Sequence, residues 1–421
     1  MFKFLHAADI HLDSPMHKLE IYEGAPAGEL REAARRAFEN LIELAITEEV
    51  AFLVISGDLY DGDWKDYNTG LYFVSQMRKL READIPVFII AGNHDAASRI
   101  TKSLRLPEGV HLFPSDKPHT VHLQNFDVAI HGQSFASPAV RTNLALKYPP
   151  PAKNCFNIGM LHTCVTGREG HEPYAPCKIE DLRSKAYDYW ALGHVHQREI
   201  FSEDPLVVFP GNIQGRHARE TGPKGCMLVE VEDSGKPKAS FRALDVARWF
   251  TLEIEAAPAE TGYDVLDLIR EGLENLLENN AGLPLVVRIR VFGDSRAHDD
   301  LASNTERWTS EIRSAAIDIS GGLVWIEKVK LETDLPVSLK SLKSSSGPVG
   351  ELLAYIDEVG NDPDQLRSLG GVLEDLDKKL PRELKEGKEA LALSDPDWLG
   401  DLLNKVRPML IRRLLKKEDA A

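Results

Sequence analysis

The chain carries five short segments in which aspartate, asparagine or histidine follows a run of apolar residues. In chain order they are Asp9-Ile10-His11, Gly57-Asp58-Leu59-Tyr60-Asp61, Gly92-Asn93-His94-Asp95, Gly159-Met160-Leu161-His162 and Gly193-His194-Val195-His196. Carboxylate, imidazole and amide ligands without thiolate suit Mn, Fe or Zn in a catalytic site better than a structural zinc. Two such ions about 3.5–4 Å apart can activate a water and stabilise both the attacking and the leaving oxygen. The segments therefore predict metal-assisted cleavage of a phosphate ester.

Seven residues of these segments are predicted ligands of two divalent ions that share the Asp58 carboxylate. The first ion is assigned Asp9, His11, Asp58 and His196. The second ion is assigned Asp58, Asn93, His162 and His194. His94 follows a ligand directly, and we interpret it as the catalytic residue that protonates the leaving oxygen or stabilises charge on the phosphate. A single histidine is usually solvated, but five such segments in this order are hard to reach by chance.

The elements that must position these residues are short buried strands. Apolar runs precede the segments at 2–8, 51–56, 87–91, 156–161 and 189–192, and further strands are expected at 206–210, 226–231 and 239–244. Helical patterns at 28–49 and 68–82 alternate with them, which favours a parallel-rich α/β core. Ligands in such folds bind at the carboxyl ends of the strands. All five segments are therefore expected on one rim of one sheet.

Five further residues are candidates for supporting the metals or contacting substrate. Asp61 and Asp95 belong to the same segments as predicted ligands. The loop 211–225 carries Arg216 and His217, for which contact with substrate phosphate and local packing are equally open. His131 is a similar case, because a structural role fits it as well as a role beside the metals does.

Three domains are expected. Residues 1–245 form the catalytic domain, and residues 246–335 form a small α/β unit with strands at 249–256, 285–291 and 323–331 and helices at 264–279 and 305–316. This unit either caps the active site or is a structural appendage. After a polar linker at 340–347, helices are expected at 348–359, 363–379 and 395–417, which make 340–421 a helical tail. The tail either docks on a partner or packs on its own domain.

Composition limits where the protein works and what it binds. No run of 18 apolar residues exists, so no membrane span is expected, and the N-terminal apolar stretch is broken by His6 and Asp9, which is unlike a signal peptide. The four cysteines form no CxxC pair, so reduced thiols and a cytoplasmic location are expected. The net charge of −16 argues against strong DNA binding by this chain alone. Two divalent ions soften that charge, and a partner could supply positive surface.

The segments resemble those of the calcineurin-like metallophosphoesterase superfamily. Within it, the start MFKFLHAADIHLDSPM and the stretch FPGNIQGRHARE at 209–220 resemble the SbcD-type DNA repair exonucleases, and more closely a bacterial branch labelled YhaO. The resemblance covers about residues 1–245 strongly and the rest in layout only. Asp61 stands where eukaryotic and archaeal repair nucleases tend to carry a histidine, which is closer to the bacterial pattern.

The resemblance implies a fold and partners. The fold is an α/β metallophosphoesterase β-sandwich flanked by helices, with a small α/β capping domain and a helical C-terminal tail. The implied activity is a DNA exonuclease of DNA repair that uses two divalent ions, Mn in preference to Fe or Zn, and a metal-bridging hydroxide. The tail would dock on a separate SbcC-like coiled-coil ATPase, because the chain has no Walker A motif. A homodimer through the catalytic domain is also implied.

Two other functions remain open. One is a phosphodiesterase or nucleotidase that acts on small-molecule phosphate esters, which the acidic charge favours. The other is a regulatory scaffold subunit of an ATPase complex, which the helical tail favours and the full ligand set opposes.

Overall fold

The computed structural model describes residues 1–14, 27–61, 67–97, 106–165, 174–280, 282–336, 348–381, 391–393, 395–400, 402–403 and 406. Two compact units are present. The first comprises Met1–Ile254, Leu266–Val291 and Thr305–Leu331, and the second comprises Glu255–Val265, Phe292–Asn304 and Glu332–Ala421. The division into three domains at 245 and 340 stays a prediction.

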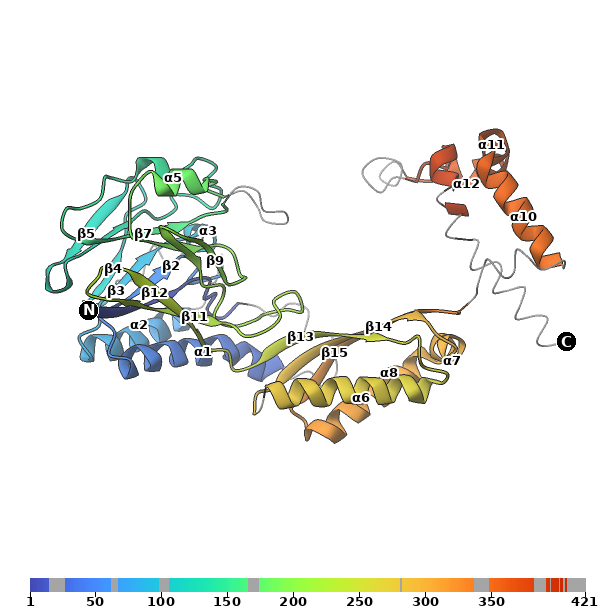
Figure 1. The fold of residues 1–421 in the computed structure, drawn as a ribbon, viewed down its shortest axis with the longest axis horizontal. Coiled ribbons are helices and arrows are strands. Elements are labelled where there is room, and N and C mark those ends of the chain that lie inside the picture. The colour runs from blue at the N-terminus through green and yellow to red at the C-terminus, as the bar shows by residue number, and fades with distance from the viewer. Residues whose placement is uncertain are drawn as a thin grey trace. The chain divides into compact units, whose positions relative to one another are not determined.

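The first large sheet has six strands in the order β12-β11-β1-β2-β3-β4. These are β12 (Pro237–Ala243), β11 (Gly225–Val231), β1 (Phe2–Ala7), β2 (Phe52–Ser56), β3 (Val87–Ile90) and β4 (Val110–Leu112). Strands β1 to β4 are parallel, and β11 is antiparallel to β1. Helices α1 (Ala27–Thr47) and α2 (Tyr67–Glu82) cover its outer face, as Figure 1 shows.

The second large sheet also has six strands, in the order β5-β6-β7-β8-β10-β9. These are β5 (His119–Leu123), β6 (Val128–Gly132), β7 (Phe156–His162), β8 (Tyr189–Gly193), β10 (Leu206–Phe209) and β9 (Glu199–Glu203). Strands β6, β7, β8 and β10 are parallel to one another, and the edge strands β5 and β9 are antiparallel to them. The short helices η1 (Gln124–Phe126), η2 (Ala145–Lys147) and α5 (Ile179–Arg183) lie in its connections.

The two sheets pack face to face around an apolar core. Phe4 of β1 stacks on Phe52 of β2 with ring centroids 4.9 Å apart, and meets Tyr189 of β8 edge-on at 5.3 Å. Every residue of β2 and β8 is buried, because the inner face meets the other sheet and the outer face meets helices or loops. Strands buried on both faces explain the nearly continuous apolar runs of the sequence. The predicted β-sandwich flanked by helices is confirmed.

One expectation was wrong: the metal segments do not share one sheet. Three of them follow β1, β2 and β3 of the first sheet, and the other two lie at the carboxyl ends of β7 and β8 of the second. The strand ends still meet, because the parallel strands of both sheets end on the same side of the sandwich. The hydroxyl of Ser56, at the end of β2, donates to the carbonyl of Ala191 in β8 at 3.0 Å. Apolar runs identify buried strands but carry no information on which sheet each strand joins.

A smaller α/β layer follows the sandwich. It consists of β13 (Arg248–Glu255), α6 (Gly262–Asn279), β14 (Leu285–Asp294), α7 (His298–Ser303), α8 (Thr305–Ser320) and β15 (Val324–Asp334). The strands form a sheet in the order β13-β14-β15. Trp249 packs in a buried cluster with Val286 and Ala218, and its indole N–H donates to the carbonyl of Gly215 at 3.0 Å. The predicted strands and helices of this region are present.

The C-terminal helices are α10 (Pro348–Asn361), α11 (Pro363–Gly371) and α12 (Glu374–Asp377). The single helix predicted for 363–379 was wrong, because it breaks after Gly370-Gly371, where two successive glycines weaken a helix. Val359, Leu366 and Leu399 form a small buried cluster. Of the helix predicted for 395–417, residues 396–400 are helical, and the basic end at 412–417 lies outside the described residues.

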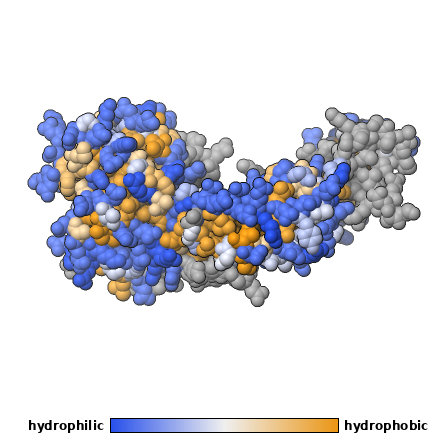
Figure 2. Space-filling model, turned by 60° about the horizontal axis from the view of Figure 1, so that its bottom comes forward, coloured by the Kyte–Doolittle hydropathy of each residue, from blue (hydrophilic) through white to orange (hydrophobic). Residues whose placement is uncertain are grey.

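The surface is largely polar. Hydrophilic residues predominate on the face drawn in Figure 2, with hydrophobic residues between them. Exposed apolar side chains include Leu71 on α2, at 64 % exposure, and Ile317 on α8, at 61 %. Among the described helices, none has the length and apolar character needed to cross a membrane.

Candidate metal centre

Four predicted ligands lie in loops whose backbone is bent sharply at the ligand itself, His194 with a φ of 94° and three others in the first two metal loops. Asp9, His11 and Asp58 have φ angles of 51°, 48° and 52°, a region that non-glycine residues seldom adopt. The N–H of Asp9 donates to the carbonyl of Gly57 at 3.0 Å, and the N–H of His11 donates to the carbonyl of Asp58 at 3.0 Å. These bonds join the first two metal loops and hold the strained residues in place.

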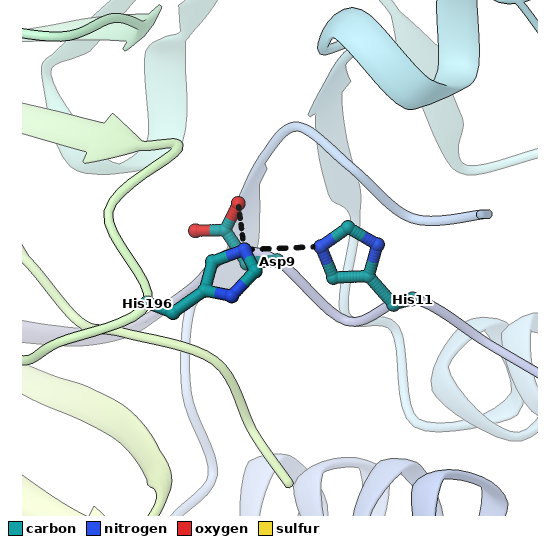
Figure 3. Close-up of side chains that lie close together, drawn as sticks. All are labelled: Asp9, His11 and His196. Atoms are coloured by element: carbon teal, nitrogen blue, oxygen red, sulfur yellow. Dashed lines mark hydrogen bonds and ion pairs between the residues drawn. The ribbon is translucent and has the colours of Figure 1, made fainter. Parts of the chain in front are cut away.

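The first predicted metal position has three convergent side chains, drawn in Figure 3. Nε2 of His11 lies 3.2 Å from Nε2 of His196, which lies 3.8 Å from Oδ1 of Asp9. Donor atoms of these three residues all lie within 4.8 Å of one another, and the side chains of Asp9 and His11 are fully buried. A buried carboxylate and two imidazoles aimed at one point fit a divalent ion.

The second predicted position is built around His162. Its Nδ1–H donates to the carbonyl of Ser56 at 2.9 Å, which leaves Nε2 facing the site. That nitrogen meets two oxygens, Oδ1 of Asn93 at 3.0 Å and Oδ2 of Asp58 at 3.4 Å. In the metal-free protein a proton on Nε2 satisfies these two oxygens, and a divalent ion would take its place. The ring of His194 lies 5.3 Å from that of His162, beside this position.

Asp58 lies between the two positions. Its carboxylate comes within 4.8 Å of donor atoms of His11 in one group and of His162 in another. Burial would raise the pKa of Asp58, but the charge and hydrogen bond of His162 outweigh it and lower the pKa to about 2. Burial would lower the pKa of His162, and Asp58 instead raises it to about 9. The site thus stabilises positive charge next to Asp58, as a shared metal ligand requires.

Burial also shifts the pKa values of two ligands predicted for the first ion, Asp9 and His11. Burial raises the pKa of Asp9 to about 6, even though His196 and His162 oppose the rise. Burial also holds the pKa of His11 well below its usual value, so its ring stays neutral. Neutral imidazole is the form that binds metals. Both oxygens of Asp9 accept from the backbone N–H of His194, at 3.1 and 3.0 Å, which fixes the carboxylate.

His94 is oriented by Asp61. Nδ1 of His94 lies 2.7 Å from Oδ1 of Asp61, and this hydrogen bond raises the pKa of the imidazole. The backbone N–H of His94, in the short helix α3 (Asn93–Ala97), donates to Oδ1 of Asp58 at 2.9 Å. The side chain is 40 % exposed and lines the groove described below. With Nδ1 engaged by Asp61, Nε2 is the ring nitrogen available to a ligand.

Asp95 and His131 both have structural roles, Asp95 between two metal loops and His131 within the second sheet. The buried Asp95 carboxylate accepts from the backbone N–H groups of Leu59, Tyr60 and Gly92 at 3.1, 2.9 and 3.0 Å, which ties two metal loops together. Burial raises its pKa to about 6. The ring nitrogens of His131 meet Thr120 Oγ1 at 2.8 Å and Asn157 Oδ1 at 3.1 Å, within the second sheet. The structure therefore does not bring His131 to the predicted ligands.

Glu220 is a site residue that sequence reasoning missed. Its Oε1 accepts from Nδ1–H of His196 at 2.6 Å, and its Oε2 accepts from Asn212 Nδ2 at 3.0 Å and from the backbone N–H of Arg216 at 2.8 Å. Its side chain is only 5 % exposed. A carboxylate behind a metal-binding histidine fixes its tautomer and aims the other nitrogen at the ion. The available signal was an acid in a loop otherwise rich in arginine and glycine.

A groove of about 710 Å³ opens above these residues. The predicted ligands Asp58, Asn93, His194 and His196 line it together with His94. Its remaining wall is partly cationic, with Arg216, Arg219 and Lys224, and also carries His217. Of the two substrate candidates there, the His217 side chain is 55 % exposed and that of Arg216 is 16 % exposed. The groove could therefore admit an anion next to the predicted metals.

Comparison with known proteins finds two family matches in the chain. Residues 2–198 match the family described as Calcineurin-like phosphoesterase, and residues 249–334 match the family Metallophosphoesterase YhaO, middle domain. The chain is 34 % identical over 294 residues to the uncharacterized metallophosphoesterase YhaO of Bacillus subtilis strain 168, covering 69 % of this chain and 71 % of the relative.

More distant similarity reaches archaeal DNA double-strand break repair proteins named Mre11. The one from Sulfurisphaera tokodaii is 28 % identical over 242 residues, covering 54 % of this chain and 59 % of the relative. The one from Sulfolobus acidocaldarius is 21 % identical over 397 residues, covering 91 % of this chain and 97 % of the relative.

Proposed function

The chain belongs to the YhaO-like branch of the calcineurin-like metallophosphoesterases, and from that premise we propose that it is a Mn-dependent DNA exonuclease of DNA repair. The observation that carries the proposal is the place of Asp58, between two sets of donor atoms and directly beside His94. The two-ion chemistry of phosphodiester hydrolysis needs that arrangement. The similarity to Mre11 proteins over most of the chain supports DNA as the substrate.

The residues divide the work as follows. The first ion would be held by Asp9, His11, Asp58 and His196, and the second by Asp58, Asn93, His162 and His194. Bound there, the ions would supply an activated water and offset negative charge on the phosphate. His94 donates a proton from Nε2 to the leaving oxygen, and Asp61 keeps the ring aimed by accepting from Nδ1–H.

Arg219 and Lys224 in the wall of the groove would give the DNA backbone its contacts. Arg219 is exposed there, and Lys224 lines the same wall while its ammonium donates to the carbonyl of His196 at 3.0 Å. Such contacts position the strand without reading its sequence. The net charge of −16 opposes DNA binding by this chain alone. A separate SbcC-like coiled-coil ATPase that docks on residues 340–421 would add the positive surface that the chain lacks. The same proposal includes a homodimer through the catalytic domain and a role for the α/β unit at 246–335 as a cap that selects the substrate.

The acidic net charge favours one alternative, a phosphodiesterase of small-molecule esters. A direct comparison separates the two. Protein loaded with Mn²⁺ is incubated with end-labelled single-stranded and duplex DNA, with cyclic nucleotides and with an aryl phosphodiester. We expect DNA to be degraded from its ends. Cleavage of the small esters with DNA left intact would support the alternative and contradict the nuclease proposal.

The role of His94 needs a variant that keeps the metals. His94→Gln should lower kcat on DNA by about 10²–10⁴-fold, the usual worth of a general acid, while Mn²⁺ still binds. His122→Gln, an exposed histidine on β5, is the matched control. Unchanged turnover in His94→Gln would remove His94 from the mechanism.

A further inference from the structure

Arg216 lies between two carboxylates at the edge of the metal centre. Its Nη1 is 3.6 Å from Oδ2 of Asp61 and 3.4 Å from Oγ of Ser14. Its Nη2 is 3.3 Å from Oε1 of Glu220 and 3.3 Å from Nδ1 of His196. The backbone N–H of Arg216 also donates to Oε2 of Glu220 at 2.8 Å. The guanidinium therefore bridges two acids that are 159 positions apart in the chain.

Each of these acids holds a different imidazole. Asp61 accepts from His94, the proposed general acid, and Glu220 accepts from His196, a predicted ligand of the first ion. The contacts form one continuous chain, His94–Asp61–Arg216–Glu220–His196, which we name the carboxylate brace. Its members come from four separate loops, those that follow β2, β3, β8 and β10, so no local turn accounts for the alignment.

We propose that Arg216 is a positioning residue that fixes the rings of His94 and His196 together, and that it does not bind the substrate phosphate directly. The role of His94 in this statement rests on the proposed function; the role of His196 does not. The Arg216 side chain is only 16 % exposed, and its terminal nitrogens already face Asp61 and Glu220. A phosphate at the same guanidinium would sit against two carboxylates and be repelled. Arg219, three residues on, is exposed on the groove and meets the need for a phosphate contact.

The electrostatics agree with the geometry. Burial would raise the pKa of Glu220, but the hydrogen bond from His196 and the charge of Arg216 outweigh it and hold the pKa well below its usual value. Burial would likewise raise the pKa of Asp61, and the bonds from His94 and Ser14 with the charge of Arg216 lower it. Each carboxylate accepts from Nδ1–H of one histidine, which leaves each Nε2 directed away from its acid.

A matched pair of arginines tests the brace. Arg216→Gln should weaken Mn²⁺ binding by about 10-fold, the lower end of the usual loss for an outer partner of a ligand, as measured by isothermal titration calorimetry. It should also lower kcat on an aryl phosphodiester with little change in KM. The interaction that is lost positions the rings of His94 and His196 and does not bind the substrate. Arg219→Gln should raise KM and leave Mn²⁺ affinity unchanged. If Arg216→Gln instead raises KM and binds Mn²⁺ normally, Arg216 is a phosphate ligand and the proposal is wrong.

Two further measurements make the test independent of activity and of folding defects. In the metal-free full chain, the ¹⁵N shifts of the His196 ring should report a proton fixed on Nδ1, and this signature should be lost in Arg216→Gln. Arg216→Lys keeps a positive charge but lacks the planar fork that reaches two carboxylates, so it should also weaken Mn²⁺ binding. Normal Mn²⁺ affinity and an unchanged His196 tautomer in Arg216→Lys would overturn the brace even if Arg216→Gln does not fold. A failure to cleave DNA would contradict the proposed function and leave these binding results standing.

Discussion

Glu220→Gln probes how much of the metal centre depends on a residue that does not touch the metals. Each carboxylate oxygen of Glu220 accepts two hydrogen bonds, Oε1 from His196 and the Arg216 side chain, and Oε2 from Asn212 and the Arg216 backbone. A glutamine keeps one oxygen, and its NH₂ group then faces two donors. At least two charge-assisted bonds are lost, at about 1.5 kcal/mol each, so the metal-free protein should lose about 3 kcal/mol of unfolding free energy.

The effect on metal binding follows from the His196 ring. Without a carboxylate on Nδ1, the tautomer and the orientation of the ring are no longer fixed, and Mn²⁺ affinity should fall by about 10–100-fold. Calorimetric titration of Mn²⁺ and urea unfolding in a chelator measure the two effects separately. Glu203→Gln, at an exposed position of β9, is the control and should change neither. A folded Glu220→Gln protein that binds Mn²⁺ within twofold of the parent would refute this reasoning.

Three other changes test the loops and the core. In Gly92→Ala the new Cβ would lie 2.8 Å from Cε1 of His162 and closer still to Asp58. Mn²⁺ affinity should therefore drop at least ~10-fold while the circular dichroism spectrum stays native. Normal Mn²⁺ affinity would contradict the packing described. Asp95→Ala leaves three buried N–H groups unpaired, at about 1 kcal/mol each or more, so urea unfolding should show a loss of about 3 kcal/mol. Burial lowers the pKa of His6 to about 3 in the folded protein, below its unfolded value of about 6.5. Below pH 6.5 the unfolded state binds a proton that the folded state does not, so the contribution of neutral His6 to the free energy of unfolding is complete above pH 6.5 and is lost as pH falls. In chelator, the stability difference between the protein and His6→Gln should shrink by about 2 kcal/mol from pH 7 to pH 5, and parallel pH profiles would show that His6 is not buried as described.

Sequence reasoning named most of the residues that the structure brings together at the candidate metal centre, because these residue types are chemically specialised. Asp9, Asp58 and His162 each follow an apolar strand, and the strand's end fixes their place to within a few residues. The assignment of strands to two sheets was beyond reach, since strand partners are chosen by packing across the core. Glu220 was also missed, because an acid in a loop is usually solvated and only the folded structure brings it behind His196.

The same limit applies at the other end of the chain. The pattern at 363–379 is helical in its apolar spacing, and the break at Gly370-Gly371 is a local effect that the spacing does not report. Arg216 illustrates the opposite case. Its place in the loop after the last metal segment could be predicted from the sequence, but its two carboxylate partners could not. Asp61 lies far from it in the chain, and Glu220, only four positions away, meets it through the fold of the loop.

The central claim is a centre of two ions that share one carboxylate. Electron paramagnetic resonance of the full chain titrated with Mn²⁺ tests it most directly, because two Mn²⁺ ions with a common bridging ligand are magnetically coupled. We predict two ions per chain with a coupled spectrum, and loss of the coupling in Asp58→Asn. A single bound ion, or two ions whose spectra stay uncoupled and unchanged in Asp58→Asn, would contradict the account.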